Sequence, residues 1–160
     1  MEITQRTATL DDAAVLLTWR NHPSAREFSL HSELIPSEEH LQWLTARLKR
    51  VQIEPFLLFA ADHEVIGMSR LDAVAESTEK YEISILIDPI QHGKGMGTRI
   101  LNMTCETFFS LYPDNTIVAN VHQHNFVSKK LFTNAGFRLL PSAGTFLRFE
   151  KTSKLRRLRF

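Results

Sequence analysis

The residues with the clearest chemical potential form a glycine-rich loop, Gly93-Lys94-Gly95-Met96-Gly97, which follows an apolar strand and leads into a helix. Glycines leave backbone N–H groups uncovered, and a helix start adds unpaired N–H groups and the positive end of the helix dipole. Together these groups make a cradle for an anion such as a diphosphate. The spacing matches neither a Walker A loop, which needs Ser or Thr directly after the lysine, nor the dinucleotide pattern G-x-G-x-x-G.

Metal and thiol chemistry are not indicated. His122 and His124 lie two positions apart near a predicted strand end, but no third ligand is spaced to join them, so we predict no metal site. Cys105, the single cysteine, falls in the middle of a predicted helix and is interpreted as a buried, inert thiol. One cysteine excludes an internal disulfide and favours a reducing, cytoplasmic location.

The composition bounds the class of protein. The chain has 160 residues, of which 43% are apolar and 23% charged, as in one soluble globular domain. No apolar stretch is long enough to span a bilayer, and the N-terminus lacks the apolar core of a signal peptide. The last ten residues carry five positive charges and no acid, so residues 1–150 have a formal net charge of −4. We therefore predict one domain over 1–150 and a basic C-terminal tail over 151–160, with no membrane or nucleic-acid partner.

The elements that position the glycine loop alternate between strands and helices. Helix signals are an N-cap at Thr9, the start Pro36-Ser37-Glu38-Glu39 with Leu41, Leu44 and Leu48 on one face, and the segments after Gly97 and Asn125. Strands are predicted over 3–6, 55–61, 64–72, 80–88, 116–122, 137–140 and 145–150, and helices over 11–20, from Ser37, over 98–111 and over 125–134. A tight Asp62-His63 turn predicts that strands 55–61 and 64–72 form a hairpin. Strand 80–88 is apolar on both faces in its second half, which is typical of a central strand. This order predicts an α/β sandwich whose sheet is largely antiparallel and is parallel only around the glycine loop.

Two segments resemble one known family. The segment YEISILIDPIQHGKGMGTRIL is similar to motif A of the GNAT superfamily of acyl-CoA-dependent N-acyltransferases, and VHQHNFVSKKLFTNAGF is similar to the family's second motif. The element order matches the same family over essentially the whole chain. The resemblance implies a mostly antiparallel twisted sheet of about seven strands with about four helices, splayed between strands 80–88 and 116–122.

The resemblance also implies that acetyl-CoA is the cosubstrate. Backbone groups of the splayed strand would pair with the pantetheine arm like an added strand, and the loop amides would hold the pyrophosphate. Two residues of the second motif would reach the cofactor, and Lys129 or Lys130 would meet its 3′-phosphate. The residues concerned are Ile85, Leu86, Ile87, His92, Gly93, Lys94, Gly95, Met96, Gly97, Thr98, Asn125, Ser128 and Lys130. His92 stands where the family usually has Gln or Arg.

The catalytic residues are less fully specified. Glu82 aligns with a general-base glutamate of several family members, acting through water, and an idle exposed glutamate is the alternative. His122 is a second candidate base, because an imidazole pKa near 6.5 suits the task. Phe132 occupies the place where many members carry a tyrosine that protonates the departing thiolate. A phenyl ring cannot donate a proton, so that role does not carry over.

The acceptor is predicted to be an amine of low pKa. A lysine amine, with a pKa of about 10.4, costs about 4.6 kcal/mol to deprotonate at pH 7, whereas an amine with a pKa of about 8 costs about 1.4 kcal/mol. An enzyme without the tyrosine acid suits the second kind. The segments LTWRNHPSAR and IPSEEHLQW also resemble family members that acetylate UDP-linked 4-amino-6-deoxy sugars for pseudaminic acid synthesis. That resemblance places Arg20, Asn21, Arg26 and Phe28 near the acceptor.

The sequence thus predicts an N-acetyltransferase that transfers an acetyl group to the 4-amino group of a UDP-linked sugar, in a ternary complex. A protein N-terminal acetyltransferase of the ribosomal-protein alanine type is the first alternative. A non-catalytic acyl-CoA-binding module is the second, and an RNA-bound ribosome-associated factor, suggested by the tail alone, is the third. For the oligomeric state, a homodimer is the alternative to a monomer.

Overall fold

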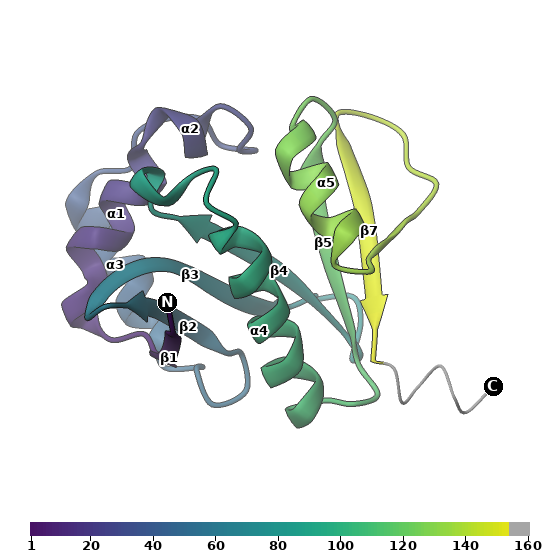
Figure 1. Ribbon diagram of the computed structural model, residues 1–160, viewed down its shortest axis with the longest axis horizontal. Helices are drawn as coiled ribbons and strands as arrows, with labels where there is room; N and C mark the ends of the chain where they lie inside the picture. Colours follow the sequence, from purple (N-terminus) through teal and green to yellow (C-terminus); the bar gives the residue numbers. More distant parts are fainter. Residues whose placement is uncertain (154–160) are drawn as a thin grey trace.

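In the computed structural model, which describes residues 1–153, seven strands form one sheet in the order β1-β2-β3-β4-β5-β7-β6 (Figure 1). Neighbouring strands are antiparallel except β4 and β5, which are parallel. The sheet class and the position of the parallel pair confirm the expectations from sequence. The strands are β1 (Ile3–Thr7), β2 (Phe56–Ala61), β3 (Glu64–Ala73), β4 (Lys80–Ile87), β5 (Thr116–His122), β6 (Arg138–Leu139) and β7 (Phe146–Thr152).

Helices cover both faces of this sheet. The long helix α4 crosses from β4 to β5 and, with α5, lies on the near face in Figure 1, whereas α3 lies behind the sheet. The structure has one more helix than the sequence suggested, the single turn α2, because His22-Pro23 breaks the first helix and Pro23 starts another turn. The helices are α1 (Ala13–Asn21), α2 (Pro23–Arg26), α3 (Ser37–Leu48), α4 (Met96–Leu111) and α5 (Phe126–Asn134).

The hairpin of β2 and β3 shows how local sequence fixes the register. Asp62 and His63 both have positive φ angles, 51° and 69°. A two-residue turn with both residues in this region matches the right-handed twist of the flanking strands. Ala61 then pairs with Glu64, as the turn requires, and the predicted hairpin is confirmed.

The two faces of the sheet have separate cores. On the face of α4 and α5, Leu71, Ile83, Ile117 and Val121 pack with helix residues that include Leu101 and Phe108. On the opposite face, Met68 and Leu58 pack with Leu16 and Trp19 of α1 and Leu44 of α3. Because side chains alternate along a strand, β3 contributes Leu71 to one core and Met68 to the other.

The buried face of α3 differs from the one that the leucine spacing predicted. Leu44 is fully buried, but Leu41 is 47% exposed, and His40 and Arg47 are buried in its place. The Arg47 guanidinium donates to the Asp72 carboxylate at 2.8 Å and to the carbonyls of Glu54 and Leu71 at 2.9 and 3.0 Å. These polar partners orient the helix so that Arg47 faces the sheet, because a buried cation is costly unless its N–H groups are paired.

Both ends of the folded region differ slightly from the prediction. The cap at Thr9 is present, since the Asp12 carboxylate accepts the Thr9 N–H at 2.8 Å, but it opens a short 3-10 turn (Leu10–Asp12) before α1. At the other end, β7 runs to Thr152, two residues into the predicted tail, because Lys151 and Thr152 pair with Ile117 and Thr116. The rest of the predicted basic tail, 154–160, lies outside the described residues.

Candidate active site

The sheet opens between β4 and β5. These strands pair only where Lys80, Tyr81 and Glu82 lie beside residues 116–118, and they diverge beyond that point, as Figure 1 shows. The expected splay is therefore present. The central-strand interpretation of 80–88 is confirmed, because β4 is the fourth of the seven strands. Of the residues of β4, however, only Ile83 is buried, because the strand lacks a neighbour on one side from there onward.

The open edge of β4 presents backbone hydrogen-bonding groups. The Asp88 N–H donates to the Ile66 carbonyl on the β3 side at 2.9 Å. Because backbone groups alternate in an antiparallel ladder, Ile83, Ile85 and Ile87 direct theirs toward the splay, whereas Leu86 pairs with Met68 of β3. An extended amide chain can add to such an edge. The edge therefore fits a pantetheine arm.

His92 closes the far end of this edge. Its Nε2 lies 3.2 Å from the Ile87 carbonyl oxygen, so the ring can donate a hydrogen bond to it. The carbonyl of Ile87 is thereby already partnered. The histidine that replaces the family's Gln or Arg thus acts on the open edge through its side chain, a contact the motif did not reveal.

The glycine loop has the geometry of an anion cradle. Gly93 and Gly95 have φ angles of +75° and +77°, a region that side-chain-bearing residues rarely adopt, and a Cβ on either would meet no atom within 4 Å. Gly95 is the N-cap of α4, which begins at Met96, two residues before the predicted start. Uncovered amides at a helix start in open space fit a pyrophosphate. Lys94 and Thr98 are exposed here.

The second motif forms the start of α5. The Asn125 side-chain oxygen accepts the Ser128 N–H at 3.1 Å and so caps the helix. Both residues also line the cleft described below. Lys130 is exposed, while Lys129 lies over the Phe126 ring, 5.0 Å from its centroid. The capping role of Asn125 fixes where α5 begins beside the splay.

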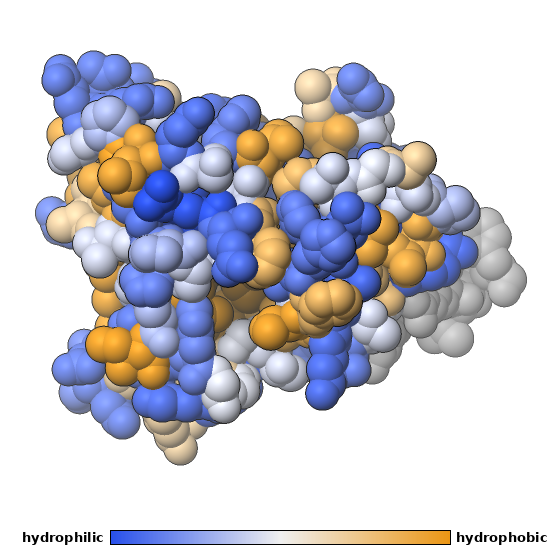
Figure 2. Space-filling model, turned by 90° about the horizontal axis from the view of Figure 1, so that it is seen from above, coloured by the Kyte–Doolittle hydropathy of each residue, from blue (hydrophilic) through white to orange (hydrophobic). Residues whose placement is uncertain are grey.

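A cleft of about 820 Å³ occupies the splay and extends across the face of the sheet covered by α1 and α3. Viewed from above, Figure 2 shows a surface of mostly polar residues with apolar ones gathered around a recess near its middle. Both strands and both sides of the sheet contribute to the cleft. Its polar lining residues include Arg20, Ser29, His31, Glu39, His40, Arg70, Glu82, Ser84, Asn120, His122, Asn125 and Ser128.

Glu82 lies where the splay begins. It is the last residue of β4 that pairs with β5, and it lies opposite Asp72 on β3. Its carboxylate is half-buried in the cleft wall, and within residues 1–153 no side chain hydrogen-bonds to it. The nearby Arg70 guanidinium interacts with it electrostatically. A carboxylate so placed is available to accept a proton from an amine or from water.

His122 is enclosed by aromatic rings. Phe28 lies 5.4 Å from it between ring centroids, and Phe146 lies at the same distance edge-on. The His122 Nδ1 accepts the His124 N–H at 3.1 Å, so the neutral ring carries its proton on Nε2. In this arrangement the ring offers a hydrogen-bond donor to the cleft. The role of His122 as an alternative base requires that this hydrogen bond break.

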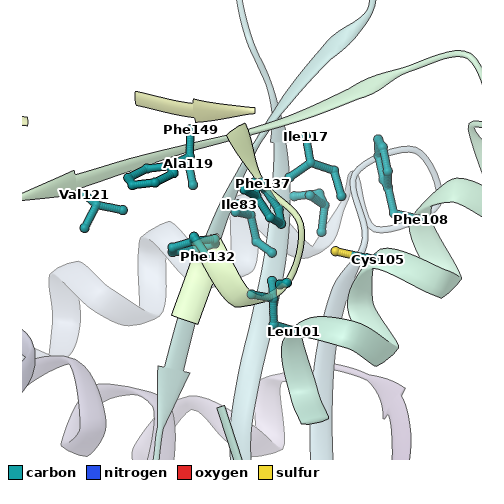
Figure 3. Close-up of a cluster of buried hydrophobic side chains, with 12 residues drawn as sticks. Ile83, Leu101, Cys105, Phe108, Ile117, Ala119, Val121, Phe132, Phe137 and Phe149 are labelled. Carbon is teal, nitrogen blue, oxygen red and sulfur yellow. The ribbon is translucent and has the colours of Figure 1, made fainter. Parts of the chain in front are cut away.

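Phe132 belongs to the core. It is 4% exposed, lies edge-on to Phe137 at 5.0 Å and stacks with Phe149 at 6.2 Å. Figure 3 shows it among these rings, close to Ile83. Its packing explains why the position can hold an apolar ring.

Most of the predicted acceptor residues hold a loop. Arg20 donates through Nη2 to the Ser29 hydroxyl and the His31 carbonyl, both at 2.9 Å, and Arg26 donates to the Ser32 carbonyl at 2.8 Å. Asn21 binds the backbone of Ile35. These contacts fix the loop between α2 and α3. Arg20 and Phe28 line the cleft, whereas Asn21 and Arg26 lie outside its lining.

The sequence analysis missed Arg70. This residue of β3 lines the cleft, and its guanidinium pairs with Asp72 and lies 5.2 Å from the centre of the Trp43 ring. Burial lowers the pKa of Arg70, and the neighbouring Arg47 charge adds to the effect, while Asp72 opposes it. The signal in the sequence is a lone cation inside the apolar stretch EVIGMSRLD of a predicted strand.

Two negative findings concern residues 1–153. No group of three His, Cys, Asp or Glu side chains there is arranged to hold a metal ion. Among the helices in that part of the chain, none has both the length and the apolar character needed to cross a bilayer.

A splayed sheet beside a glycine loop at a helix start is the fold of the acyl-CoA-dependent N-acyltransferases. The family model described as "Acetyltransferase (GNAT) domain" matches residues 2–138. The chain belongs to the GNAT acetyltransferase family and is an acetyl-CoA-dependent N-acetyltransferase of that type.

Solved structures agree with this fold. An aminoglycoside acetyltransferase in complex with coenzyme A has a TM-score of 0.81 and 19% identity, with 99% of this chain and 100% of that chain covered. A ribosomal-protein-alanine N-acetyltransferase from Brucella melitensis has a TM-score of 0.77, 21% identity and coverages of 93% and 99%. A spermidine N-acetyltransferase from Vibrio cholerae, in complex with CoA and spermine, has a TM-score of 0.80, 18% identity and coverages of 93% and 94%. No curated protein matches the chain.

Proposed function

We propose that the acceptor is the 4-amino group of a UDP-linked amino-deoxy sugar, with acetyl-CoA as the acetyl donor. The observation that carries this proposal is the Arg20 guanidinium, which lines the cleft and lies within ion-pair distance of no carboxylate in residues 1–153. A sugar nucleotide brings a diphosphate, which suits arginine. Phe28, which lines the cleft, offers a ring on which a base can stack.

Different residues of the chain bind acetyl-CoA, stabilise the developing charge and accept the proton. Acetyl-CoA supplies an acetyl group activated as a thioester. Ile85 and the Ile87 N–H, on the open edge of β4, bind the pantetheine amides, and the loop from Gly93 to Thr98 binds the pyrophosphate. A strand amide in this stretch stabilises the negative charge that develops on the carbonyl oxygen. Glu82 accepts the amine proton through water. Water protonates the departing thiolate, because Phe132 cannot.

The protein N-terminal α-amine remains a second candidate. The loop between α2 and α3 exposes Leu30 and Leu34, which are 72% and 62% exposed, beside a cleft that is open to solvent. Exposed apolar side chains next to a cleft suit a peptide chain. The low pKa of an α-amine suits a site with a single carboxylate equally well.

Turnover with acetyl-CoA, followed by thiol release, tests the proposal on a UDP-4-amino-6-deoxy sugar, N-terminal peptides and lysine peptides. We expect selective acetylation of the sugar. Selective acetylation of the peptides' α-amines would replace the sugar with the second candidate. Tight acetyl-CoA binding without turnover of any acceptor would favour a binding module.

A further inference from the structure

Two guanidinium groups line the acceptor side of the cleft, and both have a buried N–H group without a partner. Arg20 uses Nη2 to bind Ser29 and His31, but its Nη1 is buried and has no hydrogen-bond acceptor. Arg70 uses Nη1 to bind Asp72, but its Nε is likewise buried and unpartnered. An unpaired buried donor, especially a charged one, is costly, so each such group calls for an explanation.

The charges around these groups leave a surplus of positive charge. The Asp72 carboxylate forms ion pairs with two guanidiniums, those of Arg47 and Arg70. Burial and repulsion from Arg70 and Arg26 lower the pKa of Arg20. The ionisable groups that line the cleft are Arg20, His31, Glu39, His40, Arg70, Glu82 and His122.

Near the guanidiniums of Arg47 and Arg70 lie the carboxylates of Asp72 and Glu82. The buried Glu54 carboxylate also lies near Arg47, but it is paired with Arg50. Asp72 and Glu82 are half-buried, whereas Glu39 is exposed at the start of α3, where water screens it. Burial lowers the pKa of His40, which favours the neutral form of that ring. An incoming anion would therefore meet a net attraction at the floor of the cleft.

Arg70 is already oriented for such a ligand. Asp72 holds one end of its guanidinium, and the Trp43 ring lies against its face. Its side chain is 26% exposed and lines the cleft. A guanidinium fixed in this way loses little conformational freedom when it binds an anion.

We propose that Arg20 and Arg70 form an anion subsite, which binds a phosphate or carboxylate group carried by the acceptor. The inference rests on the proposed use of this cleft by the acceptor, but it does not require that the acceptor be a sugar nucleotide. Arg70 pairs with Ser84, two residues from Glu82, so the two side chains are diagonal neighbours about 7 Å apart across the strands. The acceptor's anion and amine are therefore separated by only a few bonds.

The test uses full-length protein saturated with CoA, so that the glycine loop is occupied. Inorganic pyrophosphate, inorganic phosphate and acetate are titrated in turn at constant ionic strength, while NMR follows the Arg70 Nε–H resonance, assigned by its loss in Arg70→Lys. We expect a saturable shift. A stronger response to acetate would identify the subsite as one for carboxylates, and a stronger response to the other two as one for phosphates.

Substitutions locate the site. Arg20→Met should weaken the binding of the effective anion about tenfold or more, as the loss of charge-assisted hydrogen bonds predicts. Arg138→Gln removes an exposed arginine on β6 and should leave the affinity unchanged. The backbone amide spectrum shows whether each variant is folded. The absence of a saturable shift with all three anions, or equal affinity in Arg20→Met and the unmodified protein, would overturn the subsite.

The two proposals fail in different ways. If no UDP-linked sugar is acetylated but anions bind as described, the sugar is wrong and the subsite stands. If the sugar is acetylated while Arg20→Met and Arg70→Lys leave its KM unchanged, the proposed function stands and the subsite is wrong.

Discussion

Asn21 and Ile35 hold each other by two hydrogen bonds: the Asn21 Nδ2 donates to the Ile35 carbonyl, and the Ile35 N–H donates to the Asn21 Oδ1, each at 2.9 Å. The pair joins the end of α1 to the residue that leads into α3. The loop between them carries Phe28 to the His122 ring on β5. Asn21 thus helps to fix the loop on the acceptor side of the cleft, together with Arg20 and Arg26.

Replacement of Asn21 by Ala should therefore raise the KM for the acceptor and leave the KM for acetyl-CoA unchanged. Two hydrogen bonds are lost, each worth about 1 kcal/mol, so we expect an increase of up to about 30-fold. Thr18→Ala is the control, because the Thr18 hydroxyl bonds only to Ala14 within the same helix. Steady-state kinetics with each substrate varied in turn measures the effect. An equal rise in both KM values would contradict the specific role of the loop.

Glu82→Gln should lower kcat by about 100-fold or more, the usual contribution of a general base. The deficit should shrink as the pH rises toward the acceptor's own pKa, because the free amine then forms without help. The measurement is a pH–rate profile for both proteins. Glu76→Gln, in the exposed loop after β3, removes a like charge elsewhere and should behave as the unmodified protein. A profile of the same shape before and after the Glu82 change would exclude the base role.

Gly95→Ala should raise the KM for acetyl-CoA, because a side chain at φ +77° strains the loop by about 1–2 kcal/mol and the loop relaxes away from its anion-binding form. Gly144→Ala is a matched control. Gly144 also has positive φ, +103°, and open space around it, but it lies in the loop before β7. Both variants should lose similar stability in urea unfolding. A normal KM in Gly95→Ala would show that the loop does not bind the cofactor.

Stability should decrease as the pH falls from about 7 to about 5. Burial lowers the pKa of His40, which is 5% exposed, below its ordinary value near 6.5. In that window the unfolded chain binds the proton and the folded chain resists it, so protonation favours unfolding. Urea unfolding at both pH values measures the slope. His40→Phe keeps a ring beside Trp43 and should flatten the dependence of stability on pH. His63→Asn, in the exposed turn, should leave that dependence unchanged. An unchanged slope in His40→Phe would assign the effect elsewhere.

Cys105 should not react with thiol reagents while the protein is folded. The thiol lies in the core beneath α4, and burial raises its pKa to about 11, so the reactive thiolate is scarce at neutral pH. A disulfide reagent should therefore titrate one thiol in urea and none in native buffer. Rapid stoichiometric labelling of the native protein would contradict the buried position. The same inertness keeps Cys105 out of thiol-release assays.

Features that depend on neighbours in sequence could be predicted. The Asp62-His63 turn, the cap at Thr9, the positive-φ loop at Gly93 and Gly95 and the start of α5 at Asn125 are all local, and the structure contains each of them. Their residue types restrict the backbone directly, so no distant contact is needed to fix them. The order of such elements was sufficient to indicate the fold and, with the two motifs, the family.

Features that depend on residues far apart in sequence could not be predicted from the sequence. Leucine spacing placed Leu41 on the buried face of α3, but Asp72, 25 residues beyond Arg47, draws Arg47 inward instead. Arg26 and Asn21 resembled acceptor ligands, yet the loop backbone takes their hydrogen bonds. Arg70 lines the cleft only because α1 and α3 cover its face of the sheet. The sequence by itself determined the local geometry that can bind a pyrophosphate, whereas the tertiary structure decided which charged side chains face the acceptor, because burial and pairing of a charge are settled by distant partners.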